Sequence, residues 1–155
     1  MKKVFTDGSA SPNPGPGGFS VIDSETGEPL VLGCSERTTN IVMEGMAIGC
    51  AISKVEGVSE IYTDSEFWIN TLTKWAPTWE ENGWIKKKGK IKNLELVKRL
   101  YAVYTSSKVK LIYTRGHVGT EMNEKADEWA NNARKKKTFK DLEIIEIKPV
   151  NKEDE

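Results

Sequence analysis

The stretch KVFTDGSASPNPGPGGFSVID, at residues 3–23, sets the beginning of the fold. Its first five residues are a β-prone run that ends at an acid, Asp7. The segment 8–18 is dense in glycine, proline and serine, which predicts a loop. Residues 19–23 and a further apolar run at 29–35 predict two strands joined by a turn. The first part of the chain is therefore predicted to form antiparallel strands.

The apolar pattern changes to a helical period after the third strand. Met43, Met46, Ala47, Cys50 and Ala51 recur at intervals of three and four residues, which predicts one buried face of a helix beginning at Met43. Two more strands then alternate with helices. The predicted strands are residues 60–63 and 109–114, and the predicted helices are 66–72 after Ser65, 93–105, and one capped by Thr120.

Strands that alternate with helices indicate parallel crossovers. The expected fold class is therefore α/β, with a five-stranded mixed sheet whose first three strands are antiparallel and whose faces carry helices. Residues 74–92, which are rich in tryptophan and lysine, fit no regular element. Alternation at 143–148 is consistent with a short edge strand.

Composition excludes several classes of protein. The 155 residues are 37% hydrophobic and 30% charged, which argues against disorder. No apolar run approaches the roughly 18 residues of a membrane span, and no signal peptide is visible, so an intracellular location without membrane contact is expected. One histidine and two well-separated cysteines, Cys34 and Cys50, argue against a zinc site and predict buried free thiols.

Charge is balanced overall and uneven locally. The chain has 23 basic and 23 acidic residues. Five lysines fall within KKKGKIK at 86–92, and RKKK occupies 134–137. The last fifteen residues hold six acids and two lysines. We therefore expect a main domain over 1–137 and an acidic C-terminal tail over 138–155.

Four acids lie where they can meet at one end of the predicted sheet. Asp7 and Asp64 end the first and fourth strands, and Glu44 and Asp127 each lie one residue off a buried helical stripe. For any one of them, a cap of a turn or helix is an equally good interpretation. Four clustered carboxylates need a counter-charge, and Mg²⁺ prefers such oxygen ligands together with substrate phosphates.

Four blocks of sequence resemble the type 1 ribonuclease H family in order and spacing. They are FTDGSASPNPGPGGF (5–19), RTTNIVMEGMA (37–47), YTDSE (62–66) and GHVGTEMNEKADEWA (116–130). The resemblance implies the RNase H fold and metal-dependent endonucleolytic hydrolysis of the RNA strand in RNA/DNA hybrids. It also implies a cytoplasmic monomer that acts in DNA replication.

The same resemblance assigns the catalytic residues by position. Asp7, Glu44, Asp64 and Asp127 match the family's metal-binding carboxylates, which would hold two Mg²⁺ ions with substrate, with Mn²⁺ as an alternative. His117 matches a loop histidine that assists proton transfer and the exit of metal or product. A water activated at this site would attack the phosphorus of the RNA strand, leaving 5′-phosphate and 3′-hydroxyl ends.

The resemblance assigns substrate contacts as well. Arg37, Thr39 and Asn93 match a pocket for a phosphate of the DNA strand, while Asn13 and Asn40 match positions that touch the minor groove. A basic protrusion follows, in which aromatic rings pack on sugars and lysines neutralise phosphates. Its residues are Trp75, Trp79, Trp84, Lys86, Lys87, Lys88 and Lys90, whereas Trp68 and Trp129 are expected in the core.

Two positions depart from the family pattern. Ile41 stands where an amide is frequent, and Glu66 stands where a glutamine is frequent; both lie near the expected minor-groove contacts. They bear on affinity and strand discrimination rather than on the chemistry. Two alternatives to a hybrid-specific ribonuclease stay open: a nuclease of the same fold that acts on another nucleic acid, and a non-catalytic module that binds hybrids.

Overall fold

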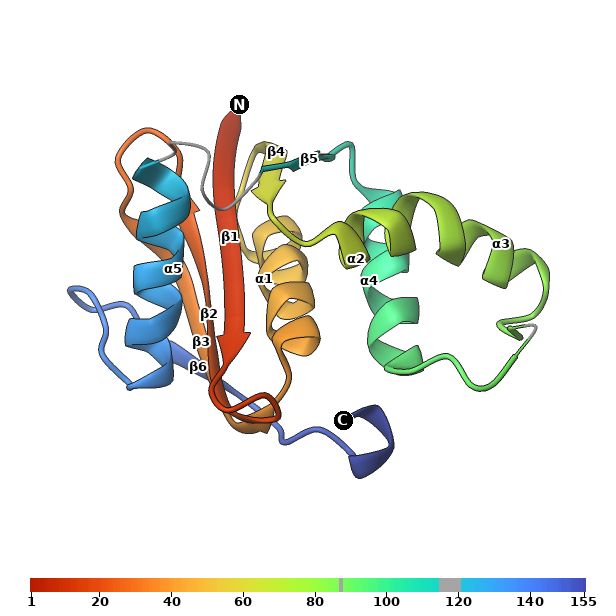
Figure 1. Cartoon of the computed structure of the whole chain (residues 1–155). Coiled ribbons are helices and arrows are strands. Elements are labelled where there is room, and N and C mark those ends of the chain that lie inside the picture. The colour runs from red at the N-terminus through yellow and green to blue at the C-terminus, as the bar shows by residue number, and fades with distance from the viewer. Residues whose placement is uncertain (87, 115–120) are drawn as a thin grey trace.

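A mixed β-sheet with helices on both faces forms the centre of the molecule (Figure 1). The computed structural model describes residues 1–86, 88–114 and 121–155. The strands are β1 (Lys2–Ala10), β2 (Gly15–Asp23), β3 (Pro29–Thr38), β4 (Val58–Thr63), β5 (Lys110–Tyr113) and β6 (Ile144–Ile147). They lie in the order β5-β4-β1-β2-β3-β6.

The pairing directions agree with the expected mixed sheet. β1, β2 and β3 are antiparallel neighbours, whereas β4 pairs parallel to β1 and β5 parallel to β4. The expected count of five strands is wrong, because the described residues form six. The additional strand, β6, pairs parallel to β3 and confirms the edge strand expected at 143–148.

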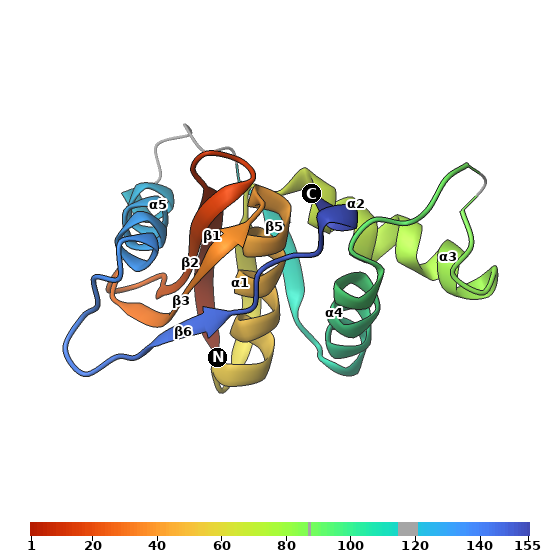
Figure 2. The same ribbon diagram turned by 90° about the horizontal axis from the view of Figure 1, so that it is seen from below.

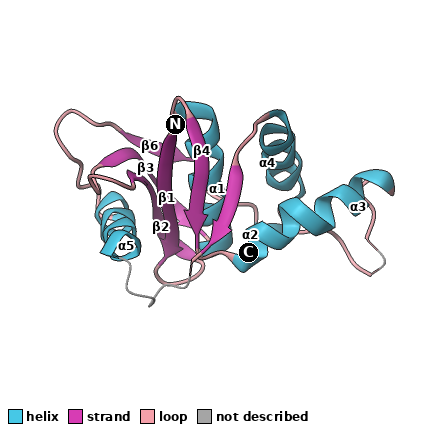
Figure 3. Cartoon of the chain, turned by 90° about the horizontal axis from the view of Figure 1, so that it is seen from above, coloured by secondary structure: helices cyan, strands magenta, loops and turns pink. Residues whose placement is uncertain are grey.

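Helices cover the two faces of the sheet unequally (Figures 2 and 3). Helix α5 packs on β1, β2 and β3, while α1 packs on the opposite face and α4 packs on α1. The helices are α1 (Asn40–Lys54), α2 (Glu66–Asn70), α3 (Ala76–Glu81), α4 (Leu94–Ser106) and α5 (Glu121–Arg134), with a π-helical turn η1 (Thr71–Trp75) and a 3₁₀ turn η2 (Lys152–Asp154). None of the helices among the described residues is both long and apolar enough to span a lipid bilayer.

Two predicted boundaries are wrong for identifiable reasons. Helix α1 begins at Asn40 rather than Met43, because Thr39 caps it by accepting a hydrogen bond from the Val42 amide at 3.2 Å. The segment 74–92 was expected to be irregular, yet η1 and α3 extend α2 as far as Glu81. Pro77 lies in the first turn of α3, directly after the π-helical turn η1.

The predicted loop at 8–18 is mostly strand. β1 runs to Ala10 and β2 begins at Gly15, with Gly8 opposite Phe19 in the ladder. A Cβ on Gly8 would lie 2.4 Å from the Met43 carbonyl carbon, and one on Gly18 would lie 2.4 Å from the Ala130 carbonyl oxygen. These glycines therefore allow helices to approach the sheet from both faces, which is why a glycine-rich sequence here is extended rather than turning.

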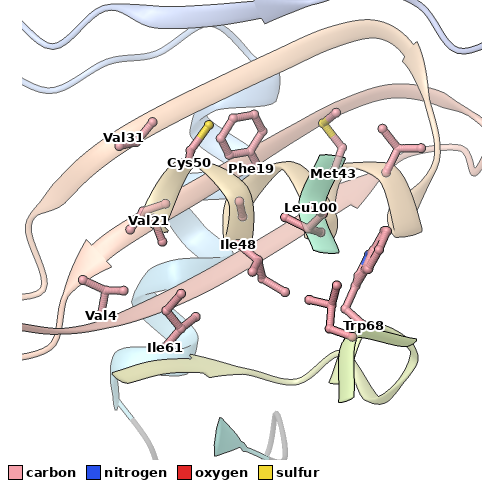
Figure 4. Packing of buried hydrophobic residues seen from close by; sticks show 14 of the residues in the cluster. Val4, Phe19, Val21, Val31, Met43, Ile48, Cys50, Ile61, Trp68 and Leu100 are labelled. Carbon is pink, nitrogen blue, oxygen red and sulfur yellow. The ribbon is translucent and has the colours of Figure 1, made fainter. Parts of the chain in front are cut away.

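The main core lies between the sheet and α1 (Figure 4). Phe19 and Ile61 of the sheet meet Met43 and Ile48 of α1, and all four side chains are fully buried. Trp68 is also fully buried, and its indole N–H donates to the Ile41 carbonyl at 2.7 Å. The expectation that Trp68 belongs to the core is confirmed, as is the prediction that Cys34 and Cys50 are buried free thiols.

Replacing Gly8 with alanine is expected to destabilise the fold. The added methyl group would overlap the backbone of α1, so the helix must move away from β1, at a cost of about 2–4 kcal/mol in unfolding free energy. Gly49→Ala is the matched control, since its Cβ would meet only the end of the Leu100 side chain, at 3.1 Å. Urea unfolding of both variants checks this, and equal stabilities would contradict the close-packing interpretation.

Candidate active site

Four carboxylates from four elements gather at one end of the sheet. Because β1 and β4 run parallel, Asp7 near the end of β1 and Asp64 just after β4 reach the same edge. The close approach of α1 to Gly8 brings in Glu44. Asp127 comes from α5, on the other face of the sheet. The electrostatic influence of Asp64 and Asp127 on Asp7, and of Asp64 on Glu44, shows that the structure brings the four predicted acids together.

The position of Asp127 depends on how α5 is fixed to the sheet. The buried hydroxyl of Ser20 on β2 donates a 2.7 Å hydrogen bond to the Ala126 carbonyl, next to Asp127. Ala126 and Ala130 are buried against the sheet, and Asp127 is exposed beside them. The helix thus presents its acid at the border of its packed face, as its sequence period predicted.

A cavity of about 260 Å³ is lined by three of these acids, Asp7, Asp64 and Asp127. Sequence reasoning missed three of its lining residues: Thr6, Asn123 and Glu124. Glu124 and Asn123 precede Asp127 by three and four positions on α5, so helical spacing from Asp127 could have identified them. Asn123 is held by the Thr114 hydroxyl, which donates to its side-chain oxygen at 3.1 Å. The lining is predominantly polar and rich in oxygen atoms.

Burial and mutual repulsion raise the pKa of three of the acids. Burial, followed by the charges of Asp64 and Asp127, raises the pKa of Asp7 to about 8, although the Gly8 amide donates to its carboxylate at 2.9 Å. Burial, followed by the charges of Asp64 and Asp7, raises the pKa of Glu44 to about 8 as well. Burial also raises the pKa of Asp64. The perturbing charges near Asp7 and Glu44 are all carboxylates.

Protonation of Asp7 and Glu44 relieves this repulsion, since a pKa of about 8 lets both carboxyls keep a proton near neutral pH. Asp7 interacts with the side chain of Asp127, and Glu44 interacts with that of Asp64. Among residues 1–86, 88–114 and 121–155, no three His, Cys, Asp or Glu side chains are arranged to hold a metal ion as they stand. The donor set still fits a hard divalent cation, because its ligand atoms are carboxylate oxygens and a cation can replace the protons on Asp7 and Glu44.

The predicted substrate-binding residues form two groups around this end of the molecule. In the first, the Asn40 amide donates to the Asn13 side chain at 3.1 Å, and Ala10 donates to the Asn40 side chain at 2.7 Å. In the second, Arg37 donates to the Glu155 carboxylate and the Asn93 amide donates to the Asp154 carboxylate. Thr39 is occupied as the cap of α1.

The predicted basic protrusion is only partly assembled as expected. Trp75 and Trp79 lie with ring centroids 6.2 Å apart and line a hollow of about 480 Å³ with Lys86 and Lys90. Trp84 instead packs against Tyr101 of α4 at 6.1 Å, away from this hollow. Lys88 is exposed, while Lys87 and His117 lie outside the described residues.

Comparison with known proteins defines the class of the chain. The family model of RNase H matches residues 1–135. A ribonuclease H of Syntrophomonas wolfei is 36% identical over 138 residues, which are 85% of this chain and 94% of that protein. A ribonuclease H of Methylorubrum extorquens is 37% identical over 135 residues, and this chain spans 59% of its length.

The fold is also similar to that of a solved RNase H structure. A crystal structure of a type 1 RNase H with the type 2 active-site motif superimposes with a TM-score of 0.69 at 24% identity, covering 89% of this chain and 74% of that one. The family model and the sequence relatives show that the molecule is an endoribonuclease, and the structure match shows the fold. The chain belongs to the RNase H family, which confirms the resemblance in its sequence, and enzymes of this family generally use divalent metal ions.

Divalent cations are expected to stabilise the protein through the four acids. Mg²⁺ should raise the Tm of the wild type, whereas in Asp64→Asn the rise should be much smaller. Without metal, Asp64→Asn should have a Tm higher than wild type by about 2–4 °C, because one repelling charge is gone. Calorimetry with and without chelator measures both effects. Glu128→Gln, an exposed neighbour on α5, is the control and should respond to Mg²⁺ as the wild type does.

The raised pKa of Glu44 also predicts a pH-dependent stability difference. The folded carboxyl, with a pKa of about 8, keeps its proton in a range where the unfolded one, with a pKa near 4.5, has lost it. This group therefore stabilises the fold less and less as the pH rises from about 4.5 to 8. Relative to wild type in chelator, Glu44→Gln should gain unfolding free energy progressively across that range. A gain that is constant with pH would contradict the raised pKa.

Proposed function

We propose that the chain hydrolyses the RNA strand of RNA/DNA hybrids at the cluster of Asp7, Glu44, Asp64 and Asp127. The observation that carries this proposal is the convergence of four carboxylates, three of which, Asp7, Asp64 and Asp127, line a polar cavity, while the fourth, Glu44, lies close enough to Asp64 and Asp7 for their charges to raise its pKa. A site that served only to bind a polyanion would lose affinity from such a cluster. Membership of the RNase H family supports hybrids as the substrate.

The four acids would hold two divalent ions, with Asp7 shared between them. Glu44 and Asp64 would complete one site and Asp127 the other. When bound, Mg²⁺ supplies a water activated for attack and stabilises charge on the leaving oxygen. The protein holds the carboxylates in place through the β1–β4 pairing and the Ser20–Ala126 hydrogen bond. In-line attack on the RNA phosphorus would leave 5′-phosphate and 3′-hydroxyl ends.

The surrounding residues would position the hybrid. Asn13 and Asn40, which are already joined by a hydrogen bond, would face the minor groove, where the 2′-hydroxyl distinguishes RNA from DNA. Arg37, Thr39 and Asn93 would bind a phosphate of the DNA strand. The hollow of Trp75 and Trp79 would take a sugar, with Lys86, Lys88 and Lys90 on nearby phosphates. His117 would assist proton transfer.

The predicted acidic tail, residues 138–155, is partly joined to the sheet. Residues 1–137 would carry the catalytic groups, and 138–155 would be an appendage attached to the sheet. β6 is the attachment, because its pairing with β3 runs from Leu32 opposite Ile144 to Ser35 opposite Ile147.

Cleavage of end-labelled substrates tests the proposed function. With Mg²⁺, the wild type should cut only the RNA of an RNA/DNA hybrid, and Asp64→Asn or Asp127→Asn should reduce the rate by more than about a thousandfold. Glu128→Gln should cut at the wild-type rate. Electrophoresis with and without chelator, together with analysis of product ends, gives the readout.

Three other outcomes would contradict parts of the proposal. Cutting of double-stranded RNA or DNA at similar rates would contradict hybrid specificity and implicate Ile41 and Glu66. Wild-type rates in Asp64→Asn would contradict the assignment of the acids. Binding of hybrid without any cutting would favour the non-catalytic alternative.

A further inference from the structure

The acidic C-terminal segment is attached along the sheet edge by β6 and continues past α1 toward the beginning of α4 (Figure 2). After β6, the Val150 amide donates to the Arg37 carbonyl at 3.1 Å. Ile145, Ile147 and Val150 pack against the main core. These contacts fix the direction of the chain, so the turn η2 and Glu155, which follows it, lie beside Arg37.

Two carboxylates of this segment occupy an anion site made by distant parts of the chain. The Glu155 carboxylate accepts hydrogen bonds from Arg37 Nε at 2.5 Å and from Arg37 Nη2 at 3.0 Å. The Asp154 carboxylate accepts one from the Asn93 amide at 2.8 Å. Lys92 Nζ donates to the main-chain oxygen of Glu155 at 3.1 Å. A forked guanidinium contact and a backbone amide are both typical of phosphate recognition.

The backbone at Asn93 is shaped for an anion. Asn93 has φ 58° and ψ 35° and immediately precedes α4, whose first amides have no capping side chain from Asn93 itself. Its side chain is buried, while its amide points to Asp154. The positive end of a thirteen-residue helix thus lies beside the bound carboxylate.

We propose that Asp154 and Glu155 act as an internal mimic of the DNA phosphate, which occupies the Arg37–Asn93 anion site until the hybrid displaces it. This inference rests on the proposed function, because that function assigns the same two residues to a phosphate of the DNA strand. The C-terminal segment would then compete with substrate for one binding contact, and the four acids of the active site would be untouched.

The contacts are suited to exchange rather than to permanent closure. The Arg37 side chain stays 50% exposed in its pair with Glu155, and exposed ion pairs are weak. The guanidinium lowers the pKa of the Glu155 carboxyl, so the mimic is fully charged at neutral pH. A hybrid offers many phosphates at once and can displace it. The mimic should therefore raise KM and leave kcat unchanged.

A matched pair of variants tests this directly. Glu155→Gln removes the charge that faces Arg37, whereas Glu153→Gln removes an equal charge from the same turn. Glu153 is exposed and makes no side-chain hydrogen bond or ion pair with the described residues. Hybrid cleavage should show KM lower by about 2- to 5-fold in Glu155→Gln, with unchanged kcat, and wild-type values in Glu153→Gln.

A second measurement keeps the inference separate from the proposed function. Inorganic phosphate is titrated into each protein while the NMR signals of the Arg37 Nε–H and the Asn93 amide are followed. Phosphate should bind several-fold more tightly to Glu155→Gln than to the other two proteins. Equal phosphate affinity in all three would overturn the inference even if cleavage proceeds. Equal gains in Glu155→Gln and Glu153→Gln would overturn it too, since bulk charge would then explain them.

The two measurements separate the possible failures. If no protein cleaves hybrid, the proposed function fails, and the phosphate titration still decides whether the segment occupies an anion site. If the wild type cleaves and both variants have its KM, the proposed function stands and the internal mimic is rejected.

Discussion

The parallel pairing of β1 with β4 is the constraint on which the site depends. Val4 lies opposite Ile61 and Phe5 opposite Tyr62, so the same register brings Asp7, inside β1, beside Asp64, which directly follows the end of β4. The hydrogen-bonded pairing of the two strands fixes the distance between these two acids. The absence of a side chain at Gly8 then brings α1 close enough to add Glu44. The apolar packing of the core therefore holds together groups that repel one another.

This repulsion explains how stability and function are related at the site. Burial and neighbouring charge raise the pKa of Asp7 and Glu44 to about 8, so without a cation these two carboxyls keep their protons near neutral pH. A divalent ion that displaces those protons gains the whole carboxylate set as ligands. The fold tolerates this repulsion because Asp64 and Asp127 stay exposed to solvent, while the adjacent Val4, Met43 and Ile61 are fully buried and hold the elements together.

The pattern of apolar residues within each segment predicted most helices and strands. The predictions failed where contacts between segments distant in the sequence determine the structure. The stripe of α1 and the fourth strand follow from residues within one element, so sequence alone located both. The glycines of 8–18 look like turn residues, and only the helices that pack on Gly8 and Gly18 show that they are strand. The contact between Arg37 and Glu155 joins residues 118 positions apart, which no local pattern reveals.

A protein with no net charge that acts on a polyanion needs its basic residues apart from its acidic ones. In this chain the lysines beside the Trp75–Trp79 hollow and Arg37 lie in other segments than the four clustered acids. The acids of the active site repel nucleic acid until cations fill them, so early attraction has to come from elsewhere. The described candidates are the lysines beside the Trp75–Trp79 hollow and Arg37. Arg37 is the one of these that Glu155 neutralises, whereas Lys86 and Lys90 carry no such partner among the described residues. In the proposed function, the C-terminal segment would therefore weaken the phosphate contact of Arg37 and leave the lysines beside the Trp75–Trp79 hollow free to attract the hybrid.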